Sequence, residues 1–177
     1  MNNIKTKTLS KINALALVRF LVLGGVMSIV PFYIHIQWIT GPMVNALLIL
    51  ALFIIGIREA FILALIPSLM ALSGGLIPAI LAPVVPFIML SNLIFIYLID
   101  RFSLILKNSD KSYWLGLFIA SFTKFIFLYL SVNIISKILI KQELIVKVVQ
   151  MMSWPQFFTA FSGGMIAFLF LKFIKRI

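Results

Sequence analysis

A lysine lies in the middle of a long apolar stretch of this chain. Lys124 is about eleven residues into the run from Tyr113 to Ile135, so a helix rising 1.5 Å per residue would carry it roughly 16 Å deep, near the midplane of a bilayer. Placing a charged side chain there costs on the order of 3 kcal/mol. We therefore expect Lys124 to face protein or water and not lipid.

Three roles fit a lysine at this depth: contact with a ligand or transported species, a hydrogen bond to another helix, or a side chain that snorkels to the membrane surface. Helical spacing puts Ala120 and Ser121 near its face, which makes that face small and polar. No carboxylate occurs within another apolar run except near its ends. We favour the first role, in which Lys124 supplies positive charge to a ligand carboxylate or phosphate, or to a polar network beneath the ligand. Ser91-Asn92, in a different run, instead fits an interhelical hydrogen bond.

Polar and aromatic side chains also gather at two other places. The segment 35–42 mixes His, Gln, Trp and Thr without charge, and Gln156 and Thr159 follow the start of the last apolar run. Such donors can orient a ligand, and an indole can stack on it. Tryptophan is also a common interfacial anchor, and small residues also allow close helix packing. The candidate binding residues are His35, Gln37, Trp38, Asn45, Lys124, Trp154, Gln156 and Thr159.

The sequence offers little for catalysis. It contains no Cys and a single His, which removes disulfides, thiolate chemistry, Fe–S clusters and a His/Cys metal cage. It has no His-Glu-x-x-His motif, no Ser/His pair within the apolar runs, no acidic cluster and no phosphate-binding loop. We predict a protein that is not an enzyme, with no catalytic residue, no metal and no cofactor, and that relies on another chain for any ATP hydrolysis.

Composition predicts how these residues are positioned. The 177 residues are 63% hydrophobic and 11% charged, whereas a soluble domain averages about half apolar and a quarter charged. A helix needs about 20 mostly apolar residues to cross a bilayer. We predict one transmembrane domain over residues 1–177, an all-α bundle with Pro42 at the first helical position of its second helix. The six spans are expected at about residues 14–34, 43–57, 60–72, 78–99, 113–135 and 154–174.

Four prolines and two glycines interrupt the middle of the chain. Backbone this irregular is tolerated at membrane depth only when it is buried in protein or lines a cavity. Two interpretations remain open: a kinked connection at the membrane surface, or the rim of a binding cavity. The prolines are Pro67, Pro78, Pro83 and Pro86.

The basic residues predict the orientation. Lys and Arg outnumber Asp and Glu by 15 to 4, and in a chain this apolar the excess indicates membrane topology and not nucleic-acid binding. With both termini in the cytoplasm, the inner segments hold ten basic residues and the outer segments, 35–42, 73–77 and 136–153, hold three. The inner ones are Lys5, Lys7, Lys11, Arg58, Arg101, Lys107, Lys111, Lys172, Lys175 and Arg176, and the outer ones are Lys137, Lys141 and Lys147.

The stretch Thr40–Ala46, the hairpin at Gly56 and the run from Pro67 to Met89 resemble the small membrane S-components of energy-coupling factor (ECF) transporters. The resemblance implies a six-helix protein that binds a vitamin, a related micronutrient or a metal ion from outside. It also implies partners: a transmembrane coupling subunit and two ATPase subunits. The N-terminal histidine arrangement of the cobalt and nickel families is missing here, which favours a small organic ligand.

S-components dock on the coupling subunit through an alanine-xxx-alanine pattern in their first helix. That pattern is not present as such. Gly24, Gly25 and Ser28 form a small-residue face in the first span, with Gly24 and Ser28 as a small-xxx-small pair, and we take this face as the candidate partner-docking surface.

Two functions therefore follow from the sequence. The favoured one is a substrate-binding subunit of an ATP-driven importer, a multi-pass protein of the bacterial plasma membrane that captures its ligand on the outer face. The alternative is a membrane scaffold without transport activity, such as the rod-shape-determining proteins, which share this size and number of spans.

Overall fold

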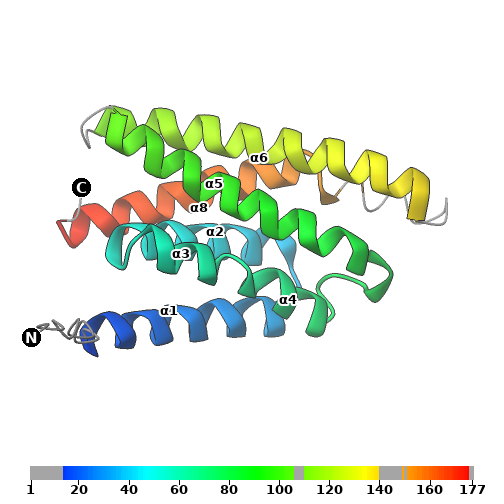
Figure 1. Cartoon of the computed structure of the whole chain (residues 1–177), viewed down its shortest axis with the longest axis horizontal. Helices are drawn as coiled ribbons and strands as arrows, with labels where there is room; N and C mark the ends of the chain where they lie inside the picture. Colours follow the sequence, from blue (N-terminus) through cyan, green and yellow to red (C-terminus); the bar gives the residue numbers. More distant parts are fainter. Residues whose placement is uncertain (1–13, 106–109, 140–148, 150, 176–177) are drawn as a thin grey trace, which may run out of the picture.

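The computed structural model describes residues 14–105, 110–139, 149 and 151–175 (Figure 1). Every regular element in these ranges is helical, which confirms the predicted all-α class. Five helices there are long and apolar enough to cross a membrane. They are α1 (Ala14–Tyr33), α2 (Gln37–Ile54), α5 (Val85–Ile105) together with the short 3₁₀ helix η1 (Ala79–Val84) that precedes it, α6 (Asp110–Leu139) and α8 (Trp154–Phe173).

The predicted span 60–72 is broken into two short helices. These are α3 (Ile57–Leu63) and α4 (Ile66–Ser73), of 7 and 8 residues. Gly56, with a φ of 130°, provides the turn between α2 and α3, a conformation that L side chains rarely adopt. Pro67 lies in the first turn of α4, where its missing N–H is tolerated. The two helices follow one another in the same direction along the bundle (Figure 1).

The second span begins six residues earlier than predicted. Helix α2 starts at Gln37, so Pro42 lies inside it and not at its first position, and most of the expected outer segment 35–42 is helical. The first turn is held by hydrogen bonds that the pattern of apolar residues does not reveal. The Ile36 carbonyl accepts the Thr40 N–H at 2.9 Å, and the Thr40 hydroxyl donates to the Ile34 carbonyl at 2.7 Å.

The other spans agree with the prediction to different degrees. Helices α1 and α8 match within one residue at each end, and α6 extends beyond both predicted limits. The predicted span 78–99 begins as the 3₁₀ helix η1, and α5 follows from Val85 and continues past the predicted end to Ile105. Most of the expected outer segment 136–153 lies outside the described residues. So do several of the basic residues that determined the predicted orientation, namely Lys5, Lys7, Lys11, Lys107, Lys141, Lys147 and Arg176.

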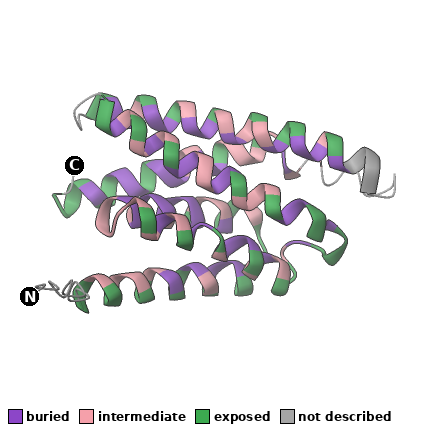
Figure 2. Ribbon diagram, viewed as in Figure 1, coloured by how far each residue is buried: buried purple, intermediate pink, exposed green. Residues whose placement is uncertain are grey.

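The helices run side by side along one axis, and the start of α1 and the end of α8 lie at the same end of the bundle (Figure 1). We call this the terminal end, where α1 begins and α8 ends, and the opposite end, where α2 and α8 begin, the distal end. Helix α2 packs mainly on α8, α5 on α6, and α1 on α4. The faces of the helices that point away from the bundle are largely exposed (Figure 2). Large apolar side chains are among these exposed residues, for example Leu21, Leu169 and Phe173, as expected where lipid is the solvent.

Two glycines bring α2 and α8 into close contact. A Cβ on Gly163 of α8 would lie 2.6 Å from the Pro42 carbonyl oxygen and 2.8 Å from the Asn45 Cβ. A Cβ on Gly41 of α2 would lie 2.7 Å from the Thr159 Cβ. Both contacts leave no room for a methyl group, so these glycines set the distance between the two helices.

Replacing Gly163 with Ala should destabilise the bundle, because the methyl group meets backbone atoms that cannot move aside. We expect a loss of about 1–3 kcal/mol, the usual cost of overpacking, seen as a lower melting temperature of the detergent-purified protein. Gly25→Ala is the matched control, since nothing lies within 4 Å of a Cβ there. Equal stability of the two variants would contradict the close contact.

Candidate functional site

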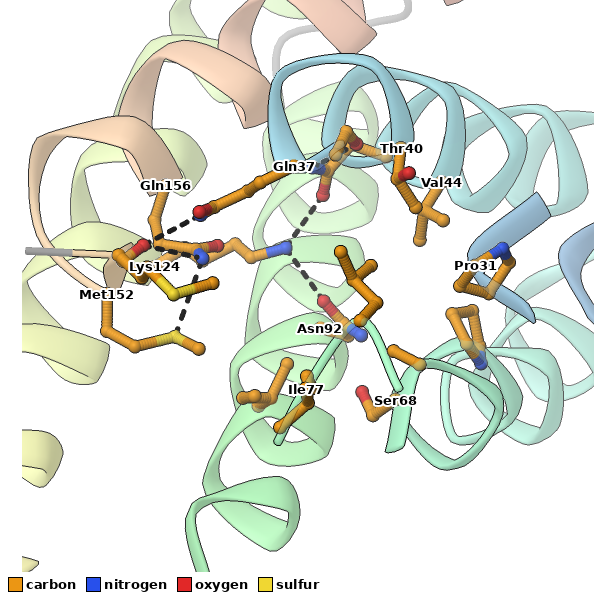
Figure 3. Close-up of a pocket in the computed structure, with 17 residues that line it drawn as sticks. Pro31, Gln37, Thr40, Val44, Ser68, Ile77, Asn92, Lys124, Met152 and Gln156 are labelled. Carbon is orange, nitrogen blue, oxygen red and sulfur yellow. Dashed lines mark hydrogen bonds between the residues drawn. The ribbon is translucent and has the colours of Figure 1, made fainter. Parts of the chain in front are cut away.

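The Lys124 side chain is fixed between two amides from other helices. Its Nζ donates to the Oδ1 of Asn45 on α2 and to the Oδ1 of Asn92 on α5, each at 2.7 Å (Figure 3). Nζ also lies 5.1 Å from the centre of the Phe95 ring, within range of a cation–π interaction. Only 3% of Lys124 is exposed. The ammonium therefore lies inside the bundle and does not reach the surface.

The backbone determines which way both amides point. The Asn45 Nδ2 donates to the Gly41 carbonyl at 2.8 Å, and the Asn92 Nδ2 donates to the Ala64 carbonyl at 3.2 Å. Each amide thus directs its NH₂ group to the backbone and its oxygen to Lys124. Ala64 lies at the break between α3 and α4, where helix-end carbonyls lack an intrahelical partner. The break therefore supplies the acceptor that orients Asn92.

These residues line a cavity in the distal half of the bundle. Its volume is about 100 Å³, or about 600 Å³ when the space that is open to the outside is included. Its walls come from α1, α2, α4, α5, α6 and the start of α8. The polar lining residues are Gln37, Thr40, Asn45, Ser68, Asn92, Lys124 and Gln156, and the apolar walls include Pro31, Val44, Pro67, Ile77, Ile88 and Met152.

Two glutamines close one side of this cavity. The Nε2 atoms of Gln37 and Gln156 both donate to the Met151 carbonyl, at 2.7 and 3.3 Å. Gln37 belongs to α2 and Gln156 to α8, so the shared acceptor joins the starts of both helices to the chain before α8. Met151 and Met152 line the cavity beside it (Figure 3). Methionine is flexible and polarizable, which suits a wall that adapts to an apolar ligand.

The eight residues predicted from the sequence divide into two groups. Gln37, Asn45, Lys124 and Gln156 line the cavity. The other four do not line it. His35 bonds the Gly74 carbonyl through Nε2, and Thr159 is buried against Gly41.

The two tryptophans of that prediction are largely exposed. Trp38 is 59% and Trp154 is 58% exposed, and neither lines the cavity. Trp154 stacks on Phe125, with ring centres 4.8 Å apart. Both lie near the starts of distal-end helices, the position where tryptophan commonly anchors a protein at the membrane surface.

Three polar lining residues, Thr40, Ser68 and Asn92, are not among the eight selected from the sequence. Asn92 makes the interhelical hydrogen bond expected for it, but to Lys124, which also places it in the cavity wall. Ser68 is 3% exposed, and its hydroxyl has no hydrogen-bond partner among the described residues. The sequence gives one indication of Ser68: it directly follows Pro67, in the proline-rich stretch for which a cavity rim is one of the two interpretations.

The proposed docking residues of α1 face different directions. Gly24 is buried, and a Cβ there would lie 3.1 Å from a methyl group of Leu63. The Ser28 hydroxyl donates to the Gly24 carbonyl within α1 at 2.8 Å. Gly25 is exposed with open space around it. Gly25 alone of the three thus offers a free surface to another helix.

Acidic side chains are absent from the described part of the cavity wall. No Asp or Glu of the described ranges lines the cavity, and the salt bridge that these ranges contain, between Lys172 and Asp110 at 2.7 Å, lies at the terminal end of the bundle. In the same ranges no three His, Asp or Glu side chains come together as a metal site requires. The cavity is therefore a polar and apolar pocket with one cationic group.

No protein-family model matches the chain, and no curated protein or solved structure matches it either. The function must therefore be inferred from the geometry of the cavity.

Removing the Asn92 amide should destabilise the protein, because it leaves both Lys124 and the Ala64 carbonyl with a lost partner. We expect Asn92→Ala to cost about 1–3 kcal/mol of unfolding free energy, measured by thermal unfolding in detergent. In a Lys124→Met background the same change should cost less, since part of the loss is the lysine bond. Additive losses would show that the two side chains do not interact.

Proposed function

We propose that this chain is the membrane-embedded substrate-binding subunit of an ATP-driven micronutrient importer of the ECF type. The observation that carries the proposal is the cavity itself: a pocket at one end of an apolar helical bundle, lined by polar and apolar side chains, with a buried lysine at its wall. A binding subunit needs such a pocket, whereas a scaffold does not. The residues around it provide binding groups and none of the side-chain pairings of a hydrolytic site.

The proposed topology has six spans in a bacterial plasma membrane, with α3 and α4 together forming the third. The terminal end carries the charges expected of a cytoplasmic face, since Arg58, Arg101, Lys111, Lys172 and Lys175 all belong to helix ends located there. The distal end then faces outward. In this orientation the cavity lies in the half of the bundle nearer the side from which an importer takes its ligand.

The energy for uptake is assigned to other chains. A coupling subunit and two ATPases are the proposed partners, because this sequence contains no nucleotide-binding loop. The exposed face of α1, which includes Gly25 and large apolar residues such as Leu21 and Val22, is the proposed docking surface. The chain itself is proposed to bind its ligand without chemical change.

Single introduced cysteines test the topology. The sequence contains no cysteine, so any labelling by a thiol reagent reports the introduced one. A cysteine at Ile36, which is 56% exposed between α1 and α2, should react with an impermeant thiol reagent in intact cells. A cysteine at Asn3 should react only after the cells are opened. Labelling of Asn3→Cys from outside, or protection of Ile36→Cys, would contradict the proposed orientation.

Co-purification tests the partners. The tagged chain, solubilised from its native membrane, should carry along a transmembrane coupling subunit and two ATPases, identified by mass spectrometry. Gly25→Trp should reduce their recovery several-fold, because the indole blocks close approach of a partner helix. Leu130→Trp, at an exposed position of α6 on the other side of the bundle, is the control. Recovery of cell-wall machinery in place of ATPases would support the scaffold alternative.

A further inference from the structure

We propose that the ligand is a small organic acid, and that its single carboxylate binds the Lys124 ammonium from within the cavity. The inference rests on the proposed binding function and specifies the class of ligand. It comes from a charge without a counter-charge, from the direction of the surrounding hydrogen bonds, and from a buried hydroxyl that has no partner.

No carboxylate among the described residues balances the charge of Lys124. The sequence holds four acidic residues. Glu59, Asp100 and Asp110 do not line the cavity, and Glu143 lies outside the described residues. A buried cation without a counter-charge is costly, and neutral amide oxygens compensate for it only in part. A bound anion would complete the pair.

The hydrogen bonds around Lys124 also leave a place for an acceptor. A lysine ammonium has three N–H donors, and the described residues accept two of them, at Asn45 and Asn92. The distance of 2.7 Å in both bonds is typical of charge-assisted hydrogen bonds. Both asparagines direct their NH₂ groups to backbone carbonyls. The donor that this polar cluster presents to the cavity is therefore the lysine.

The number of charges favours a carboxylate over a phosphate. Lys124 is the one Lys or Arg that lines the cavity within the described ranges, so a monoanion gives a neutral site. A phosphate monoester carries a charge of about −1.5 to −2 at pH 7 and would leave negative charge buried. The proline, valine and isoleucine walls opposite fit an apolar body. A carboxylic acid with an apolar body satisfies both parts of the cavity.

Ser68 supplies a second polar contact. Its hydroxyl is buried in the wall formed by α4, with no partner among the described residues, and Figure 3 shows it across the cavity from Lys124. A buried hydroxyl left without a hydrogen bond is unfavourable. A polar atom on the ligand would satisfy it. Ser121 is equally buried and equally without a described partner, but it does not line the cavity, and this makes it a natural comparison.

The first experiment establishes the class of ligand. The probe is a rich-medium extract separated by ion exchange into anionic, neutral and cationic fractions, and the readout is the melting temperature of the full-length protein in detergent. The anionic fraction should raise it, because a ligand that binds only the folded state stabilises that state. Amidation of carboxylates with a carbodiimide and methylamine should abolish the effect, whereas phosphatase treatment should not.

Each other outcome of this experiment has a distinct meaning. Stabilisation by the neutral or cationic fraction alone would overturn the inference and keep the proposed function. If phosphatase treatment abolishes the stabilisation, the ligand carries a phosphate and not a carboxylate, and the inference is also overturned. Stabilisation by no fraction would contradict the proposed binding function, and the inference with it.

The second experiment tests Lys124, with the acid isolated from the anionic fraction as the probe. Lys124→Met should weaken binding by at least about 30-fold, as expected for removing one partner of a buried charge pair. Lys172→Met is the matched control, because it removes an exposed lysine at the terminal end. Unchanged affinity of Lys124→Met would overturn the inference.

Two further variants keep the test decisive if Lys124→Met does not fold. Asn92→Asp places a carboxylate beside Lys124 and keeps a hydrogen-bond acceptor for it. The new carboxylate should pair with the ammonium in place of the ligand, so the affinity of the folded protein for the acid should fall by a similar factor. Ser68→Ala should weaken binding about 3- to 10-fold, the worth of a neutral hydrogen bond, and Ser121→Ala should not. Full binding by Asn92→Asp, or equal effects of the two serine changes, would count against the site.

Discussion

The structure depends on how a lysine is held inside an apolar bundle. An ammonium at this depth needs hydrogen-bond acceptors, and it finds them on two helices that are distant in sequence, at Asn45 and Asn92. Each amide needs its own acceptor to point the right way. One uses the carbonyl of Gly41 one turn earlier, and the other uses the carbonyl of Ala64. The position of one charge thus constrains α2, α5, α6 and the break between α3 and α4.

The close packing of α8 belongs to the same arrangement. Gly163 lets α8 approach the backbone of α2 directly behind Asn45, and Gly41 accommodates Thr159. The cavity then occupies the space that these constraints leave between α1, α4 and the polar cluster. Its walls are fixed by backbone contacts on one side and by adaptable methionines on the other.

The sequence predicts the class of fold and the depth of Lys124 because both depend on local properties. Length and apolarity of a segment are enough to identify a membrane helix, and the position of a lysine within it follows by counting. The role of Asn92 could not be found in this way. Its partners, Ala64 and Lys124, lie 28 and 32 positions away, so their meeting depends on how whole helices pack.

The errors at helix boundaries also arise from hydrogen bonds that local sequence properties do not reveal. Helix α2 begins before Pro42 because of hydrogen bonds from the Thr40 backbone and side chain to residues 34 and 36. Proline is common at the first position of a helix, but its presence in the sequence does not reveal that hydrogen bonds extend the helix ahead of it. Ser68 was missed because a single serine in an apolar run carries no periodic signal. Its significance appears only when the opposite wall of the cavity is known.

The break between α3 and α4 also has a consequence for biosynthesis. Residues 57–73 leave the ribosome before Asn92, the residue that satisfies the Ala64 carbonyl. Until α5 has been made, that carbonyl has no such partner, and exposing it to lipid is unfavourable. The hydrogen bond that satisfies the break therefore forms during assembly of the bundle, after α3 and α4 have been made.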